Sequence, residues 1–158
     1  MPNNDLVIRL AKKEDLAEMQ ELFAETISAV CAKDYDAAQI KAWISSVENT
    51  GRWLDKMTRQ HFLIAEITER IVGYASLEAG NYFDFLYVHK DFQKQGIAQS
   101  LLQKIEVEAK NHGAITIDLD VSITAKPFFE KNGYMVIRTN TSILNGVKIV
   151  NYRMAKHI

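Results

Sequence analysis

A segment near the middle of the chain, Leu86 to Ala98, has the residue types of an anion-binding loop and reads LYVHKDFQKQGIA. The pattern predicts a strand, a loop and then a helix that opens at Gly96. The first turn of such a helix has unpaired backbone N–H groups and a partial positive charge. Gly96 has no side chain and Ala98 has a small one, so a phosphate can approach the backbone there. The segment therefore predicts a cradle for a pyrophosphate.

Two well-known phosphate motifs do not describe this segment. A Walker A loop needs a different glycine spacing and a Lys-Ser/Thr ending, and a Rossmann fingerprint needs more than one glycine. Taken alone, a single glycine at a helix start favours an ordinary strand–loop–helix turn. The wider sequence pattern reverses that preference.

The segment, extended to LYVHKDFQKQGIAQSLLQKIE, resembles the acetyl-CoA motif of the GCN5-related N-acetyltransferases (GNAT family). Gln93, Gly96 and Ala98 match the motif's core, Gln/Arg-x-x-Gly-x-Gly/Ala. The stretch from Ser122 to Tyr134 resembles the family's second motif, Asn-x-x-Ala-x-x-Phe/Leu-Tyr-Glu-Lys-x-Gly-Phe/Tyr. The resemblance covers nearly the whole chain, and two motifs at the right separation are more specific than either alone. The chain is thus similar to small bacterial-type members of this family.

The resemblance implies acetyl-CoA as cosubstrate and suggests which residues bind it. Backbone groups at the end of the predicted strand would hold the pantetheine arm, namely those of Leu86, Tyr87 and Val88. The Val88 N–H would be the best donor to the thioester oxygen as charge develops. The pyrophosphate would be held by backbone N–H groups of Gln93, Lys94, Gln95, Gly96, Ile97, Ala98, Gln99 and Ser100. The Lys94 side chain has two equal interpretations, a phosphate contact or a solvated surface charge. Ser122 stands where the family's pantetheine-contacting Asn is found.

The family transfers an acetyl group directly to an amine, and an ammonium of pKa ~10.4 must first lose a proton. Asp84 is the candidate base, because it is a carboxylate within an apolar strand. A period of two places it on one strand face with Tyr82, Leu86 and Val88. The alternative is that Asp84 faces solvent or pairs with an Arg or Lys. The four histidines are expected to be structural or exposed: His61, His89, His112 and His157.

The leaving thiolate would benefit from an acid, and here the sequence departs from the family. Phe129 occupies the position of the usual tyrosine acid and has no proton to give. We name Ser122 and Tyr82 as candidates in its place, since a hydroxyl can donate or relay a proton. Tyr87 is a further hydroxyl on the opposite strand face, and solvent is another source. Tyr134 is expected to pack in the core.

The resemblance implies that two N-terminal helices and the loop between them recognise the acceptor amine. This region holds Cys31, Asp34, Tyr35, Trp43 and Trp53. Asp34 and its near neighbour Asp36 would favour a cationic amine, whereas we expect both tryptophans to be core anchors. Cys31 is not expected to be a nucleophile, because no histidine lies near it in sequence and the family transfers the acetyl group directly.

Other functions stay open at this stage. Because Phe129 removes the usual acid, a non-catalytic acyl-CoA-binding sensor or interaction module is one alternative. The acceptor is open between a small-molecule amine and a protein amine, and charged transfer RNA is disfavoured because the chain lacks a basic run. The acyl chain length is also open, and so is the choice between a monomer and a homodimer.

Composition limits the class of protein. The chain has 158 residues, 47% hydrophobic and 25% charged, with a net charge of −1, which predicts a single globular domain. The resemblance implies that this is one acetyltransferase domain over 1–158. Near-neutral charge argues against a nucleic-acid partner. Neither a secretory signal nor a membrane-spanning segment is expected. A single cysteine cannot form an internal disulfide or a Cys-based metal site, so we expect no metal and a reducing, cytoplasmic location.

Hydrophobic periodicity predicts the elements that must position these residues. Strands are expected over 6–10, 61–67, 71–78, 82–88, 115–121, 134–142 and 147–155. Helices are expected over 13–30, 36–47, 96–112 and 124–132, with 48–60 irregular or part-helical. Hairpin turns are expected at Thr68–Arg70 and Leu144–Gly146. The order β-α-α-β-β-β-α-β-α-β-β predicts an α/β fold with a mixed, mostly antiparallel central sheet flanked by helices. This order fits the GNAT-like fold that the resemblance implies.

Overall fold

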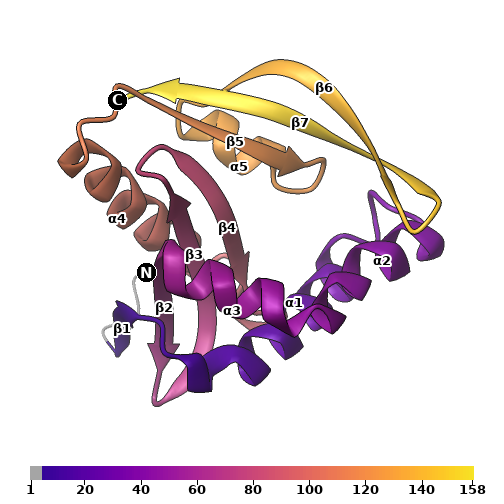
Figure 1. Cartoon of the computed structure of the whole chain (residues 1–158), viewed down its shortest axis with the longest axis horizontal. Helices are drawn as coiled ribbons and strands as arrows, with labels where there is room; N and C mark the ends of the chain where they lie inside the picture. The colour runs from indigo at the N-terminus through magenta and orange to yellow at the C-terminus, as the bar shows by residue number, and fades with distance from the viewer. Residues whose placement is uncertain (1–4) are drawn as a thin grey trace.

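The computed structural model describes residues 5–158, in which one seven-stranded sheet forms the centre of the molecule (Figure 1). Residues 1–4, with which the predicted domain and the N-terminal segment begin, lie outside the described residues. The strand order is β1-β2-β3-β4-β5-β7-β6, and all neighbours are antiparallel except β4 and β5. The predicted fold class is confirmed. The strands are β1 Leu6–Leu10, β2 His61–Ile67, β3 Arg70–Glu78, β4 Tyr82–Val88, β5 Thr116–Ser122, β6 Met135–Leu144 and β7 Val147–His157.

Helices cover both faces of the sheet. They are α1 Leu16–Val30, α2 Ala37–Ile44, α3 Thr50–Arg59, α4 Ile97–Asn111 and α5 Lys126–Lys131. Short 3₁₀ turns occur at Lys13–Asp15, Ser45–Glu48 and Lys90–Phe92. Within residues 5–158, no helix has both the length and the apolar character needed to cross a bilayer.

Helix α3 corrects the expectation of an irregular or part-helical segment over 48–60. The Asn49 side chain accepts a hydrogen bond from the Arg52 N–H, which caps the helix N-terminus. Trp53 is buried against the ring of Phe23 on α1, with 5.1 Å between the ring centroids. The sequence signal is weak because few apolar residues mark the helix, and tertiary packing of Trp53 stabilises it instead.

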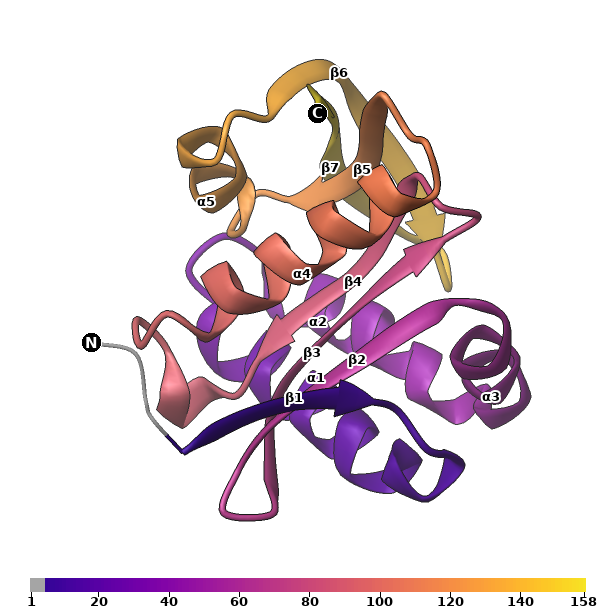
Figure 2. The same ribbon diagram turned by 90° about the vertical axis from the view of Figure 1, so that its left-hand side faces the viewer.

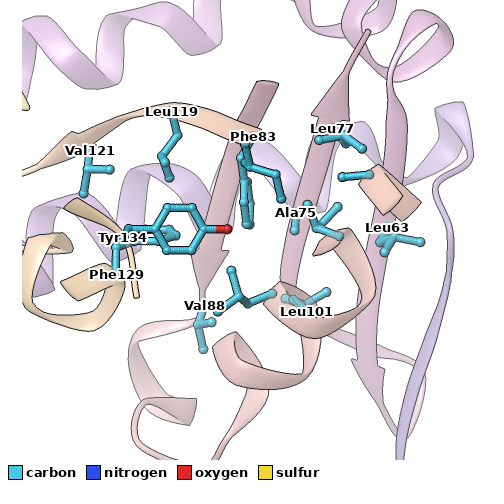
Figure 3. Close-up of a cluster of buried hydrophobic side chains, with 14 of the residues drawn as sticks. Leu63, Ala75, Leu77, Phe83, Val88, Leu101, Leu119, Val121, Phe129 and Tyr134 are labelled. Atoms are coloured by element: carbon cyan, nitrogen blue, oxygen red, sulfur yellow. The ribbon is translucent and has the colours of Figure 1, made fainter. Parts of the chain in front are cut away.

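Each face of the sheet has its own hydrophobic core. Helices α4 and α5 cover one face, and α1, α2 and α3 cover the other (Figure 2). Figure 3 shows the first core, into which β4 sends Phe83 and β5 sends Leu119. The second core is rich in aromatic rings, among them Phe23, Trp53 and Tyr74. Strands β4 and β5, which both contribute to the first core, are also the strands that form the site described below.

A bulge in β4 changes which face its side chains take. Leu77 of β3 is opposite Phe83, whereas Ala75 is opposite Leu86, so two steps on β3 span three on β4. Phe83, Leu86 and Val88 therefore join the α4 side, while Phe85 and Tyr87 join the α1 side. Asp84 reaches helix α3. This corrects the prediction that Asp84 shares a face with Leu86 and Val88, because strict alternation does not hold across a bulge.

Candidate active site

Strands β4 and β5 pair at one end and then separate. Tyr82 is paired with Asp118, and the Asp118 N–H donates to the Asn81 carbonyl at 3.1 Å. Beyond this point β5 stays paired with β7 along its whole length, from Thr116 to Ser122. The strands therefore diverge, as Figure 1 shows, and leave one edge of β4 without a neighbouring strand. A V-shaped opening in the sheet results.

The backbone of β4 directs alternate residues toward this opening. The His89 N–H donates to the Val72 carbonyl at 2.8 Å, and the Phe85 N–H donates to the Ser76 Oγ at 3.2 Å. Both of these N–H groups thus point to β3. Since successive residues of a strand point their N–H groups to opposite edges, those of Leu86 and Val88 point into the opening.

Tyr87 does not present its backbone to the opening. It is paired with Tyr74 of β3, and its carbonyl oxygen lies against Gly73 of the same strand. This corrects the expectation that the Tyr87 backbone would pair with the pantetheine arm. The Tyr87 ring lies on the other face of the sheet and contacts Phe23 at 4.9 Å between ring centroids.

The Val88 carbonyl is held by two side chains. Thr26 Oγ1 donates to it at 3.0 Å from α1, and Gln93 Nε2 donates to it at 2.7 Å from the following loop. These bonds fix the end of β4 and the start of the loop relative to each other. Gln93 therefore positions the loop through its side chain, a role that the motif alone did not indicate.

The loop after β4 has the backbone geometry of an anion cradle. Lys94 and Gly96 both have positive φ, 59° and 82°, and alternation of left- and right-handed residues turns successive N–H groups inward. The first helical bond of α4 runs from the Ser100 N–H to the Gly96 carbonyl at 3.0 Å. The N–H groups of Ile97, Ala98 and Gln99 precede it and have no helical acceptor.

Two residues of the predicted cradle are placed differently by the structure. The Ser100 N–H is used inside the helix, so it is not free for a phosphate. Gln95 does not line the cleft, whereas Gln93, Lys94 and Gln99 do. A side chain built at Gly96 would meet no atom within 4 Å, so open space lies beside this glycine.

The cradle and the opening belong to one cleft of ≈ 680 Å³, which lies within the range of ligand sites, ~300–1,000 Å³. On the α4 side its lining includes Phe83, Leu86, Val88, Phe92, Ile97, Ala98, Leu119, Val121, Ala125, Phe128 and Phe129. On the α1 side its lining includes Cys31, Tyr35, Trp43, Tyr87 and Ile149. The cleft therefore passes through the sheet from one face to the other.

Asp84 lines this cleft and is held by helix α3. Its Oδ2 accepts hydrogen bonds from Lys56 Nζ at 2.9 Å and Gln60 Nε2 at 2.7 Å. Among the described residues, none hydrogen-bonds to its Oδ1. Asp84 is mostly buried, with 16% of its side chain exposed. The carboxylate is thus paired with a lysine through one oxygen, while its other oxygen is left without a hydrogen bond from the described residues. Sequence reasoning missed Lys56 and Gln60, because neither lies near Asp84 in the chain.

Ser122 lines the cleft at the end of β5. Its Oγ accepts a hydrogen bond from the Ala125 N–H at 3.1 Å, which leaves the hydroxyl proton available to a second partner. Ser122 is therefore placed to donate a proton or a hydrogen bond into the cleft, although its role as acid stays a prediction.

The other candidate acids are placed less favourably. Tyr82 does not line the cleft; its hydroxyl donates to Asp120, which also accepts from Arg153 Nη1 at 3.1 Å. Burial and the bond to Asp120 raise the pKa of Tyr82. Phe129 is buried edge-on against Phe83 and Tyr134. Tyr134 is a core residue, as expected, and its hydroxyl donates to Glu106 at 3.0 Å.

The predicted acceptor region is divided by the structure. Trp53 is a core anchor, as expected, and its Nε1 donates to the Ser46 carbonyl at 3.0 Å. Trp43 lines the cleft instead, which corrects the expectation that both tryptophans are core anchors. Asp34 accepts a hydrogen bond from Thr124 Oγ1 at 2.7 Å, and Asp36 caps helix α2. Neither of these carboxylates lines the cleft.

Burial raises the pKa of one thiol and two phenol groups that line the cleft. Burial raises the pKa of the Cys31 thiol, and the Thr124 side chain offsets part of that effect. Burial likewise raises the pKa of Tyr35 and of Tyr87. None of the histidines in the described chain lines the cleft; His89 is buried and its Nδ1 accepts a hydrogen bond from the Asp91 N–H at 3.0 Å.

Comparison with known proteins agrees with this geometry. Residues 31–156 match the family model described as an acetyltransferase (GNAT) domain. The chain belongs to the GNAT acetyltransferase family. A solved GCN5-related N-acetyltransferase from Rhodopseudomonas palustris is 31% identical to this GNAT chain, with a TM-score of 0.96 and coverage of 100% of this chain and 99% of the other. The predicted family, fold and enzyme class are confirmed.

Two further proteins are similar to this GNAT chain. The uncharacterised N-acetyltransferase YafP of Escherichia coli strain K12 is 28% identical over 151 residues, covering 96% of this chain and 95% of YafP. The PaiA N-acetyltransferase of Thermoplasma acidophilum, solved in complex with coenzyme A, has a TM-score of 0.80. It is 23% identical and covers 97% of this chain and 99% of its own, so it shares the fold.

Proposed function

We propose that this N-acetyltransferase takes its acetyl group from acetyl-CoA through the β4–β5 opening and passes it directly to a primary amine on the other face of the sheet. The observation that carries this proposal is the continuity of two features. The unpaired edge of β4 leads without a break into the backbone cradle at Gly96, and both line one cleft.

The cleft fits the chemistry of a coenzyme A thioester. The Leu86 N–H would pair with an amide carbonyl of the pantetheine arm, as a neighbouring strand would, and the Val88 N–H, on the same edge, would face the thioester carbonyl. The N–H groups from Gln93 to Gln99 that face the cradle would hold the pyrophosphate, with Lys94 at its side. When bound, acetyl-CoA supplies an activated carbonyl carbon and a thiolate leaving group.

The reaction needs one group to take a proton and one to give a proton. Asp84 would accept the ammonium proton at Oδ1, while Lys56 and Gln60 keep Oδ2 fixed. The amine nitrogen then forms a bond to the carbonyl carbon, the carbon–sulfur bond breaks, and the sulfur leaves with its electron pair. The Val88 N–H would stabilise charge on the thioester oxygen. The Ser122 hydroxyl would give a proton to the sulfur and would regain one, through water, from the second proton that the nitrogen loses. The net products are an amide, free coenzyme A and one proton.

Location and assembly extend the same proposal. A single buried cysteine fits a reducing compartment, so we place the enzyme in the cytoplasm.

Strand β6 lies at the edge of the sheet and exposes three apolar side chains. The exposed fractions are 74% for Met135, 59% for Ile137 and 66% for Ile143. An exposed, apolar edge strand favours pairing with a second chain, so a homodimer would form there. Sedimentation should show a dimer that Ile143→Lys dissociates, and a wild-type monomer at all concentrations would contradict this.

Thermal denaturation with and without ligand tests the cosubstrate. A ligand present at 100 times its Kd adds ~2.7 kcal/mol of stability, which at this chain length shifts Tm by about 5–10 °C. We expect the shift with acetyl-CoA and with coenzyme A, and none with NAD or ATP. Release of free thiol on adding amines then tests transfer. The absence of a shift at millimolar acetyl-CoA would overturn the proposal, and a shift without thiol release from any amine would favour the sensor alternative.

A further inference from the structure

The cleft ends on the α1 side in a small chamber with aromatic walls. We call this the aromatic chamber; its residues are Cys31, Tyr35, Trp43, Tyr87 and Ile149. The rings of Tyr35 and Trp43 meet edge-on at 5.4 Å between centroids. All five belong to, or pack against, the core on the face opposite to the cradle. A molecule in this chamber would therefore approach the opening from the side away from the coenzyme phosphates.

Side-chain hydrogen bonds join α2, and the turn that follows it, to the β6–β7 hairpin beside the chamber. Gln39 Nε2 donates to the Lys148 carbonyl at 3.0 Å, and Asn145 Nδ2 donates to the Ser45 Oγ at 2.8 Å. Tyr35 adds a third link, since its hydroxyl donates to the Val150 carbonyl at 2.8 Å. These bonds fix the positions of the two elements that contribute Trp43 and Ile149 to the chamber.

The chamber offers rings more than polar groups to a ligand. The Tyr35 hydroxyl is used twice, because it also accepts a hydrogen bond from the Ile123 N–H at 2.9 Å. Asp34 is bonded to Thr124 beside the chamber. Asn151 also lines the cleft and has a buried Oδ1 without a hydrogen-bond partner in the described part of the chain, so one ligand donor would find an acceptor there. A ligand with many amides or a second charge would lose more hydration than this one acceptor restores. A flat apolar ring has little hydration to lose and would pack against the aromatic side chains of the chamber.

One carboxylate oxygen in the cleft lining has no hydrogen-bond partner among the described residues. Of the acidic side chains in the described cleft lining, Asp120 is bonded to Tyr82, Asn140 and Arg153. Asp84 keeps its Oδ1 without a hydrogen-bond partner among the described residues. A ligand that matches the aromatic side chains and the single free carboxylate oxygen has one aromatic ring and one amino group.

We infer that the acceptor is an arylalkylamine, whose ring lies among Tyr35, Trp43 and Tyr87 and whose amino group points to Asp84. This inference rests on the proposed function, because it names the substrate class of that same site. It disfavours polyamines, which carry further charges, and peptide N-termini, which carry unpaired amides.

The first test compares amines by thiol release at saturating acetyl-CoA. The panel is 2-phenylethylamine, hexylamine, spermidine and a short peptide with a free N-terminus. We expect kcat/KM for 2-phenylethylamine to exceed that of each other amine by at least about tenfold. An equal value for hexylamine would overturn the aromatic class, and a higher value for spermidine or the peptide would overturn the inference altogether. No turnover of 2-phenylethylamine would overturn it too.

The second test uses binding, and depends on the chain having two tryptophans, Trp43 and Trp53. We expect 2-phenylethylamine to change the tryptophan fluorescence of the enzyme–coenzyme A complex. Trp43→Phe should abolish that change, because only the buried Trp53 remains, yet keep KM for the amine within about threefold, because an aromatic ring is retained. Trp43→Leu should raise KM about tenfold. An unchanged KM in Trp43→Leu would contradict the inference.

The two proposals fail in different ways. If acetyl-CoA does not raise Tm, the proposed function is wrong, and the arylalkylamine inference, which depends on it, is wrong too. If acetyl-CoA raises Tm in the wild type and in Trp43→Leu alike, but the amine preference differs from the one stated, the arylalkylamine inference alone is wrong.

Discussion

At the scale of single residues, Asp84 decides whether the site can take a proton. We expect Asp84→Asn to lower kcat by about 10²–10⁴-fold, because an amide cannot act as a base. KM for acetyl-CoA should stay within about threefold, since Asp84 is not in the cradle. Steady-state thiol release measures both constants.

Asp118→Asn is the matched control for Asp84→Asn. Asp118 lies on the adjacent strand but does not line the cleft, so its kcat should equal that of the wild type. A wild-type rate in Asp84→Asn would show that another group, or water, accepts the proton.

Cys31 lines the cleft, so a mechanism in which its thiol carries the acetyl group has to be tested. Burial raises the pKa of its thiol, so the thiolate fraction at neutral pH is small. We expect iodoacetamide to modify native Cys31 at least about tenfold more slowly than the same thiol in urea. Intact mass after incubation with acetyl-CoA should show no added acetyl group, and a stable acetyl adduct on Cys31 would contradict direct transfer.

At the scale of elements, the start of α4 carries the cradle, and Gly96 is the position that permits it. A side chain at φ 82° is strained by roughly 1–2 kcal/mol, and a methyl group would enter the open space beside the N–H groups. We expect Gly96→Ala to lower stability by about 1 kcal/mol and to weaken acetyl-CoA binding at least about tenfold, as measured by thermal denaturation and titration calorimetry.

Gly51→Ala is the control for a glycine-to-alanine change in open space. Gly51 lies in helix α3, and a Cβ there also meets no atom within 4 Å. Because alanine is the better helix former, this variant should gain about 0.5–1 kcal/mol and bind acetyl-CoA as the wild type does. Equal binding by Gly96→Ala would remove Gly96 from the cradle.

The edge of β4 makes a second prediction at this scale, measurable by amide hydrogen exchange. The N–H groups of Leu86 and Val88 should exchange fast in the free enzyme and at least about tenfold more slowly with acetyl-CoA bound. The Tyr87 N–H, which points to β3, should be protected in both states. Fast exchange at Leu86 and Val88 in the complex would show that the pantetheine arm does not pair with this edge.

At the scale of the whole molecule, β1 is tied to the first helix by a charged pair that should make stability depend on pH. Arg9 Nη1 and Nη2 each donate to one oxygen of Asp15, both at 2.9 Å. The hydrogen bond from Arg9 lowers the pKa of Asp15 from its usual value of 3.8. A lowered carboxyl pKa stabilises the fold above that usual value, and the contribution is lost as pH falls through the folded-state pKa.

Asp15→Asn tests this sign. At pH 7 the variant should be less stable by about 1–2 kcal/mol, a modest value because the pair is partly solvated. The difference should shrink as pH falls below about 3.8. Urea denaturation at several pH values measures it, and a difference that grows toward low pH would contradict the assignment.

Much of this protein follows from local patterns in its sequence. The seven strands, four of the helices, the turn at Asn145-Gly146 and the glycine at the start of α4 all follow from periodicity and backbone preference, which act over a few residues. Two motifs at the expected separation were enough to predict the family from the sequence. The fold, the enzyme class and the cosubstrate then followed from the family.

Only the tertiary structure decided which side chains share the site. Lys56 meets Asp84 because α3 packs beside β4, and Trp43 lines the cleft while Trp53 does not, although both lie in similar amphipathic surroundings. The bulge at Asp84 and the unpaired edge of Leu86 and Val88 depend on how β4 is aligned with β3 and how β5 leaves it for β7. Such contacts join residues distant in the chain, so no local pattern determines them; the packing of one element against another does.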